Sequence, residues 1–321
     1  MKILTLIFRL IVSFTFIFSG FVKLVDPLGS TYKFQEYFSS DVLNLEFLIP
    51  YALPFSIFLI MAELLLGVML LLGYLPKFTM WSLFFMILVF LFLTWYSAYF
   101  DKVLDCGCFG DAVKLTPWES FYKNVVLLVF ILVLLFSTKH IKPLINISFA
   151  KWATFLSFIT FLYLTYYVLV HLPIIDFRPY AIGKNILEGM KAAGAELPLI
   201  HDFYLENADG KNLTDEVLNE DKVMLIVAYN LDKSDRQGFP KIKAVTDQAI
   251  KNGYKVYLLS ASLEDDFLAI KDEFDLNFEM LFCDETTLKT IIRANPGIVT
   301  LQKGTVIGKW NWIDGEEVFA N

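Results

Sequence analysis

The sequence predicts an α-helical membrane bundle followed by a soluble α/β domain. Three observations carry this prediction: long apolar stretches in the first half, strand and helix patterns that alternate in the last third, and the overall composition. Hydrophobic residues make up 56% of the 321 positions and charged residues only 19%, whereas about a quarter of the residues in globular proteins are charged. This composition argues against a purely soluble protein.

Each apolar stretch is long enough to cross a hydrocarbon layer of about 30 Å, which takes about 20 helical residues. The five stretches are 4–22, 51–74, 78–98, 120–138 and 149–171. Lipid offers backbone groups no hydrogen-bond partners, so all five are expected to be helices. Arg9 interrupts the first stretch, which also lacks a small-x-small cleavage pattern. We therefore expect a retained span rather than a removed signal peptide.

Lysines predict the orientation in the membrane. The connections after the second and fourth stretches carry positive residues without carboxylates: Lys77, Lys139, Lys142 and Lys151. Positively charged short loops favour the cytoplasmic side. The sequence therefore predicts a multi-pass protein of the bacterial plasma (inner) membrane. Its loop 99–119 and everything after residue 171 would lie on the periplasmic, extracytoplasmic side.

The charges exclude nucleic acid as a partner. Up to Tyr180 the chain has 12 Lys and Arg against 10 Asp and Glu, and beyond it 15 against 24. The soluble part is therefore acidic and has no basic stripe to neutralise phosphates. The partner that the composition does imply is the lipid bilayer.

The last third alternates strands and helices. Strands are expected at 222–229, 254–261, 279–283, 297–302 and 306–312, and helices at 238–252, 263–274 and 284–294. This order predicts a sheet covered by helices on both faces. The domain boundaries follow: 1–140 for a transmembrane domain, 141–175 for the fifth span and a connector, 176–200 for a linker and 201–321 for the α/β domain.

Cys106 and Cys108 flank Gly107 in the loop segment DCGCFGD. Gly107 lets the backbone bend, and a disulfide in so small a ring would be strained and easily reduced, as a thiol–disulfide exchange site requires. Zinc or Cu(I) binding is an alternative, but the loop offers no third and fourth ligand, so no metal site is predicted. The structural alternative is that both residues only pack the loop against the bilayer surface.

Glu63 lies inside an apolar stretch, where an ionised carboxylate is costly and normally has a partner in the bundle. Arg9 is the natural candidate for that partner. A buried structural ion pair and a functional proton site are both open. Lys23 and Asp26, just before Pro27, are expected to be a snorkelling residue and a helix-stop residue.

Cys283 stands at the end of a predicted strand. A lone cysteine is usually a small buried hydrophobe, and this is the favoured interpretation. The functional alternative, a weaker hypothesis, is exchange with Cys106 or Cys108.

Several of these residues form a pattern that resembles the DoxX-like membrane superfamily and, within it, the MauE family of methylamine utilisation proteins. The pattern comprises Arg9, Ser19-Gly20, Lys23, Asp26-Pro27, Glu63, Gly67, Gly73, CGCFG at 106–110 and Lys123-Asn124. The resemblance covers about residues 1–140. It implies a four-helix membrane bundle, here with a fifth span added, and a role in disulfide formation or thiol redox during maturation of periplasmic proteins. Relatives linked to quinone-coupled oxidation make a quinone a possible cofactor, although no cofactor is evident from the residues.

The last 120 residues resemble a thioredoxin-like domain. The strand KVMLIVAY, a following helix, the NPG segment with a possible cis Pro296 and the final hairpin stand in the thioredoxin order. This domain departs from the family at one place: NLDKSDRQ stands where the family carries Cys-x-x-Cys. Ordinary two-thiol exchange is therefore not expected of this domain by itself.

Three functions remain open at this stage. The first is thiol–disulfide redox through Cys106 and Cys108, as a thiol-disulfide or quinone-linked oxidoreductase component that works with a client protein or a partner oxidoreductase. The second is a non-catalytic assembly protein whose thioredoxin-like domain is a docking module. The third is a carrier or channel that uses Glu63 and Arg9, which the lack of a visible inverted repeat makes less attractive.

Overall fold

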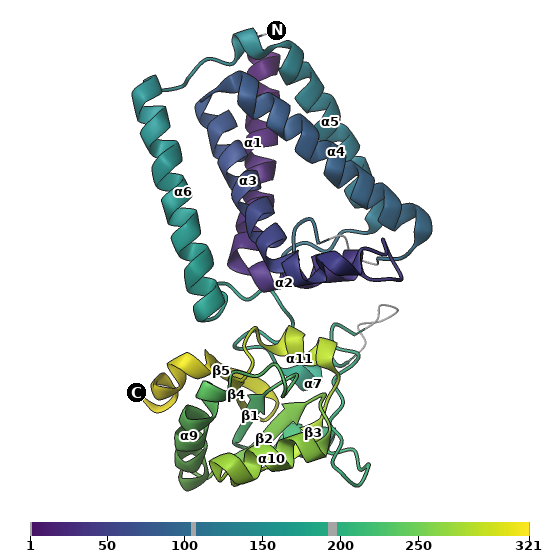
Figure 1. Ribbon diagram of the computed structural model, residues 1–321, viewed down its shortest axis with the longest axis vertical. Helices are drawn as coiled ribbons and strands as arrows, with labels where there is room; N and C mark the ends of the chain where they lie inside the picture. Colours follow the sequence, from purple (N-terminus) through teal and green to yellow (C-terminus); the bar gives the residue numbers. More distant parts are fainter. Residues whose placement is uncertain (1, 104–106, 192–197, 321) are drawn as a thin grey trace. The chain divides into compact units, whose positions relative to one another are not determined.

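The chain folds into two compact units, Met1–Leu169 and Val170–Asn321. A computed structural model describes residues 2–103, 107–191 and 198–320 (Figure 1).

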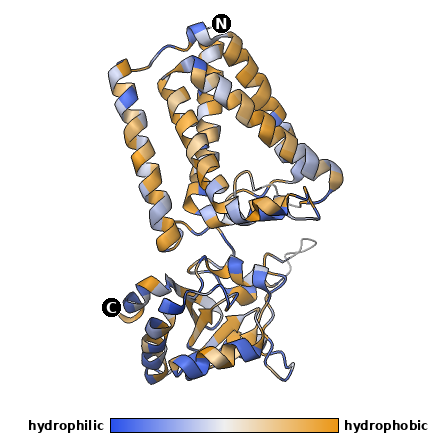
Figure 2. Cartoon of the chain, viewed as in Figure 1, coloured by the Kyte–Doolittle hydropathy of each residue, from blue (hydrophilic) through white to orange (hydrophobic). Residues whose placement is uncertain are grey.

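The first unit is helical. Its helices are α1 (Lys2–Val25), α2 (Pro27–Phe38), α3 (Ala52–Leu72), α4 (Pro76–Phe100), α5 (Pro117–Phe136) and α6 (Ile147–Val170), with 3-10 turns η1 (Glu46–Tyr51) and η2 (Thr138–His140). Within the described residues, five helices are long and apolar enough to cross a membrane: α1, α3 with its preceding turn, α4, α5 and α6. The five predicted spans are confirmed. Figure 2 shows the apolar colouring along all of these helices.

Two glycines let α1 and α3 pack closely. A Cβ added at Gly20 would come within 2.7 Å of Leu64 Cγ, and one at Gly67 within 2.8 Å of Ile17 Cγ1. Small residues at helix crossings bring backbones together in membrane proteins. This close pairing sets which side chains of α1 can reach α3.

The fifth span, α6, is peripheral to the other four. Phe161 and Leu164 pack against the small core cluster formed by Leu24, Ile60 and Leu64 of α1 and α3. Most of the α6 surface is exposed in the unit, as expected for a helix that is solvated by lipid. The arrangement is a four-helix core with one added span.

The short helix α2 was not predicted. Asp26 caps its N-terminus by accepting a hydrogen bond from the Gly29 amide at 3.0 Å, and Pro27 follows at the first helical position. The expected helix-stop role of Asp26 therefore includes the start of the next helix. Tyr37 and Phe38 bury the inner face of α2. The segment mixes polar and aromatic residues over one short stretch, so its apolar periodicity is weak.

The second unit is an α/β domain around a five-stranded sheet. The strands are β1 (Val223–Val227), β2 (Lys255–Ser260), β3 (Glu279–Phe282), β4 (Gly297–Gln302) and β5 (Thr305–Asn311). Their order is β3-β2-β1-β4-β5, with β1, β2 and β3 parallel and β4 antiparallel to both β1 and β5. The peptide bond between Asn295 and Pro296, just before β4, is cis, as the sequence predicted.

Helices cover both faces of the sheet (Figure 1). They are α7 (Ile186–Gly189), α8 (Thr214–Asn219), α9 (Phe239–Lys251), α10 (Glu264–Phe274) and α11 (Glu285–Ile291), with 3-10 turns η3 (Arg236–Gly238) and η4 (Trp312–Phe319). Along β1, Leu225 points into the core shared with α8 and α11, and Ile226 into the core shared with α9 and α10. This alternation follows from the two-residue period of a strand.

Part of the segment assigned to a linker, 176–200, is built into the second unit. Tyr180, Ile186 and Ile200 are buried in one of its two cores. Asp176 binds both Arg178 Nε at 2.7 Å and Lys309 Nζ at 2.6 Å, which ties the segment to β5. Burial pushes the pKa of Asp176 up, but the charges of Arg178 and Lys309 outweigh burial and hold it below its ordinary value.

We expect Asp176→Asn to lower the free energy of unfolding of the second unit by about 3 kcal/mol, because two buried cations lose their shared carboxylate. Hydrogen exchange of the β5 amides in the full-length protein in detergent measures the loss. The lowered pKa means that this stabilisation is present above the ordinary carboxyl pKa and fades as the pH falls through the lowered value.

The control is Asp221→Asn, which removes a carboxylate from an exposed pair with Lys303 at 3.2 Å. Exposed pairs contribute about 0–1 kcal/mol, so little change is expected. Equal losses in the two variants would contradict a special role for Asp176.

Candidate functional site

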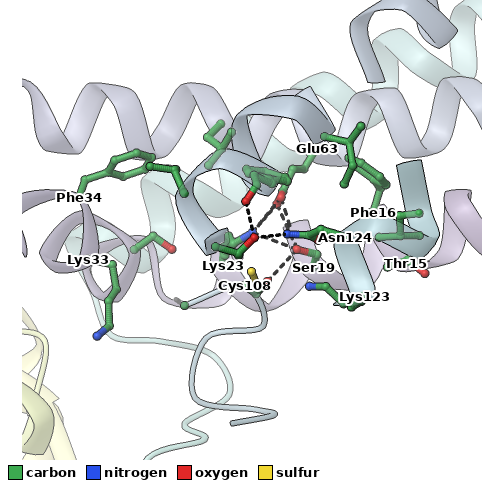
Figure 3. A pocket seen from close by; sticks show the side chains of 18 of the residues that line it. Thr15, Phe16, Ser19, Lys23, Lys33, Phe34, Glu63, Cys108, Lys123 and Asn124 are labelled. Carbon is green, nitrogen blue, oxygen red and sulfur yellow. Dashed lines mark hydrogen bonds and ion pairs between the residues drawn. The ribbon is translucent and has the colours of Figure 1, made fainter. Parts of the chain in front are cut away.

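A pocket lies inside the four-helix core of the first unit, with side chains from α1 to α5 and from the cysteine loop around it (Figure 3). It encloses about 720 Å³ of empty space, including the part that opens outward. Its walls are largely aromatic and aliphatic, and the charged residues that line it are Lys23, Lys33, Glu63 and Lys123. The site is therefore an apolar chamber with a small charged region.

Lys23 and Glu63 form a buried ion pair at this pocket. Lys23 Nζ lies 2.8 Å from Glu63 Oε1 and 2.9 Å from Oε2. The two side chains are 8% and 0% exposed, so neither charge is satisfied by bulk water. If either charge lost its partner here, the free energy of unfolding would fall by roughly several kcal/mol. The predicted snorkelling of Lys23 is wrong, because its ammonium turns inward to the carboxylate.

Ser19 belongs to the same group. It precedes Lys23 by one helical turn, so both side chains stand on one face of α1. Lys23 Nζ donates to Ser19 Oγ at 2.9 Å, and Ser19 Oγ donates to the main-chain carbonyl of Cys108 at 2.8 Å. The serine therefore joins the ion pair to the cysteine loop.

Arg9 is not the partner of Glu63, contrary to the expectation from the sequence. Its guanidinium donates to the carbonyls of Leu70 and Leu71 at 2.8 Å each and of Lys142 at 2.9 Å. The Leu70 and Leu71 carbonyls lie at the C-terminal end of α3, where the last carbonyls of a helix have no N–H partner one turn further on. Arg9 and Lys23 are fourteen residues apart on α1, about 21 Å along the axis. Arg9 therefore stabilises the end of α3 rather than the pocket.

The cysteine loop reaches the pocket through Gly107 and Cys108. Gly107 and Gly110 have positive φ values of 65° and 49°, a conformation that glycine adopts without strain. Lys123 Nζ stands 4.2 Å from the centroid of the Phe109 ring, a cation–π distance. Cys108 is half-buried, and Cys106 lies outside the described residues.

Polar groups on α4 and α5 complete the charged region. Asn124 Nδ2 donates to Thr94 Oγ1 at 3.2 Å, and both residues are buried. Sequence reasoning singled out Lys123-Asn124 only through a family pattern and did not find Thr94. The spacing of Ser19 and Lys23 was a signal that could have indicated a shared site.

Cys283 lies in a different environment. It is fully buried in the core of the second unit, and burial raises the pKa of its thiol to about 12. Because the thiolate is the nucleophile in exchange, this environment supports the favoured interpretation of a packing residue.

The segment after β1, where the thioredoxin resemblance of the sequence would place a Cys-x-x-Cys pair, is held in place by hydrogen bonds. Asn295 Nδ2 donates to the Asn230 carbonyl at 2.9 Å, and Ser234 Oγ donates to Asn295 Oδ1 at 3.0 Å. The segment thus has a defined structure without a thiol. Within the described ranges, no cluster of three or more His, Cys, Asp or Glu side chains is placed to hold a metal ion.

Residues 1–137 match the family model described as methylamine utilisation protein MauE. Over these residues the membrane unit is similar to the MauE family. The pocket, the Lys23–Glu63 pair and the cysteine loop all lie within the matched residues, so the site belongs to the part of the chain that shares this similarity.

No curated protein matches the chain. One similar solved structure is the crystal structure of a thioredoxin-like protein from Bacteroides caccae. It is 16% identical, and the alignment covers 85% of this chain and 83% of that chain with a TM-score of 0.27. At so low a score, the thioredoxin-like fold of the second unit rests on its own strand order and on the antiparallel β4–β5 hairpin.

Breaking the ion pair should destabilise the membrane unit. We expect Glu63→Gln or Lys23→Met to lower its stability by about 3 kcal/mol, because each leaves a buried charge without its partner. The double variant Lys23→Met/Glu63→Leu should lose less than either single variant. Thermal unfolding in detergent measures all three.

The control for that series is Glu36→Gln, which breaks the pair with Lys33 at 2.9 Å, where both side chains are more than a third exposed. It should change stability by less than about 1 kcal/mol. Additive losses in the double variant would mean that Lys23 and Glu63 do not act as a pair.

Cys283 should resist modification. With a thiol pKa of about 12, the thiolate at pH 7 is about one part in 100,000. A maleimide at neutral pH is therefore expected to leave Cys283 of the folded protein unlabelled and to label it fully in denaturant. Labelling of the folded protein as fast as Cys108 would contradict the buried placement.

Proposed function

We propose that this multi-pass membrane protein acts in thiol–disulfide redox during the maturation of extracytoplasmic proteins, with Cys106 and Cys108 as the reacting pair. The observation that supports this most is the docking of the Cys108 main chain on Ser19, beside the buried Lys23–Glu63 pair. A loop that only packed against the bundle would not need a charged group of this kind below it.

Oxidation or reduction of the Cys106–Cys108 pair requires an electron carrier. Conversion of the two thiols to a disulfide forms one S–S bond and releases two electrons and two protons, and the reverse step takes them up. A partner oxidoreductase or a lipid quinone is the class of carrier that we propose. A client protein exchanges the same two electrons and two protons with the loop pair by oxidation or reduction of its own cysteines.

The pocket fits a quinone by its chemistry. Its walls are apolar, and Lys123 and Asn124 bring hydrogen-bond donors to the polar region, where a carbonyl oxygen would find partners. Such a group would supply two-electron, two-proton redox chemistry. Lys123 would hold a carbonyl oxygen. Glu63 and Lys23 would compensate each other's charge beside it.

The location is part of the proposal. We place the protein in the bacterial plasma membrane with the cysteine loop and the C-terminal domain on the periplasmic side. The lysine-bearing connections between α3 and α4 and between α5 and α6 support this orientation.

A second candidate function is a non-catalytic assembly protein whose thioredoxin-like unit is a docking module. The thiol-free segment 230–237, fixed by Asn295, favours it. In that case the cysteines of the loop would stay reduced.

Thiol labelling in intact cells separates the two functions. With a membrane-impermeant maleimide, we expect Cys106 and Cys108 to label only after treatment with a reductant. In Cys106→Ser and Cys108→Ser, the remaining loop cysteine should label without reductant, because its disulfide partner is gone. Both variants should lose thiol–disulfide exchange down to the uncatalysed rate.

Cys283→Ser is the matched control, and it should behave as the unaltered protein in both measurements. Labelling of both loop cysteines before reduction would instead support the docking function. Labelling only after lysis would overturn the proposed orientation.

A further inference from the structure

The cysteine loop is connected to the buried ion pair by an unbroken chain of hydrogen bonds. Glu63 binds Lys23 Nζ at 2.8 Å, Lys23 Nζ donates to Ser19 Oγ at 2.9 Å, and Ser19 Oγ donates to the Cys108 carbonyl at 2.8 Å. Figure 3 shows Cys108 next to Ser19 and Lys23 in this group. Ser19 thus belongs both to the polar group between α1 and α3 and to the contact with the loop.

The orientation of the hydroxyl follows from its neighbours. Lys23 carries only donors, so Ser19 Oγ must accept from it and can use its single hydrogen elsewhere. The distances from Ser19 Oγ to the Glu63 oxygens are 3.4 and 3.5 Å, whereas the Cys108 carbonyl lies at 2.8 Å. The hydrogen is therefore directed to the loop.

This hydrogen bond constrains the thiol. It fixes the peptide unit that follows the Cys108 Cα, and Gly107 with its positive φ precedes that Cα. Phe109, beneath Lys123, holds the other side of the loop. Without the serine hydroxyl, the Cys108 carbonyl would lose this hydrogen bond to α1, and the loop would be held less firmly at the pocket.

We propose that Ser19 is the positioning residue of this site, which holds Cys108 at the pocket by linking its main-chain carbonyl to the Lys23–Glu63 pair. The effect of Ser19 on thiol–disulfide exchange rests on the proposed function. The anchoring of the loop by Ser19 is independent of that function and is measured separately.

The test is Ser19→Ala in the full-length protein in detergent, in the reduced state. We expect hydrogen-exchange protection of the loop amides 107–113 to fall about fivefold, since a hydrogen bond of ordinary strength is lost. The rate of thiol–disulfide exchange should fall by a similar factor, and the thermal midpoint of the protein should stay close to that of the unaltered chain.

Thr15→Ala is the matched control. Thr15 lies one turn before Ser19 and lines the same pocket, but its Oγ1 donates to the Ile11 carbonyl of its own helix at 2.8 Å. It should leave the hydrogen-exchange protection of the loop unchanged. Ser19→Thr keeps the hydroxyl and should restore both the loop protection and the exchange rate, which a loss of packing at this position would not allow.

The two measurements fail independently. Unchanged loop protection in Ser19→Ala, or an equal loss in Thr15→Ala, overturns the positioning role. Reduced protection together with the absence of any thiol exchange in the unaltered protein upholds the anchoring role and overturns the proposed function.

Discussion

The buried contact between Lys23 and Glu63 is the constraint on which the rest of the membrane unit depends. Glu63 is inaccessible to solvent, and its charge is compensated by the ammonium at 2.8 Å. That contact is possible because Gly20 and Gly67 bring α1 and α3 close together. The face of α1 that carries Lys23 also carries Ser19, and Ser19 receives the cysteine loop. The helix packing, the pocket and the loop thus all meet at one compensated charge.

Much of the architecture could be predicted because it depends on composition and period. Apolar runs of about 20 residues define spans without knowledge of their neighbours, and β1 to β5 follow from short runs between turn residues. The identity of the partner of Glu63 could not be predicted, because it depends on the offset between α1 and α3. That offset is set by the contacts of Gly20 and Gly67, which the sequence does not reveal.

Other parts of the site were inaccessible to sequence reasoning for a similar reason. Lys23 stands at the end of an apolar run, where lysines commonly extend to the membrane surface. Its inward orientation is determined by Glu63 on another helix. The helix α2 is short and of mixed polarity, and only its capping residues, Asp26 and Pro27, gave a local indication.

The two units differ in where their cysteines lie. The thioredoxin-like unit keeps the strand order of its fold, but Asn230, Ser234 and Asn295 bind one another where a thiol pair would stand. Its own cysteine, Cys283, is a core residue. The half-buried Cys108 belongs to the membrane unit instead, so a thiol reaction in this chain depends on the bundle.

The attachment of Arg9 and Lys23 of α1 to α3 has a consequence for how the two helices sit in lipid. Arg9 finds its carbonyl partners at the end of α3, and Lys23 its carboxylate in the middle of that helix. A charged residue at the centre of a lone span costs about 3 kcal/mol on insertion, and Glu63 lies near the middle of α3, while Arg9 and Lys23 lie nearer the two ends of the α1 span. Each helix carries charge that the other satisfies, so α1 and α3 are more stable in lipid as a pair than either would be alone.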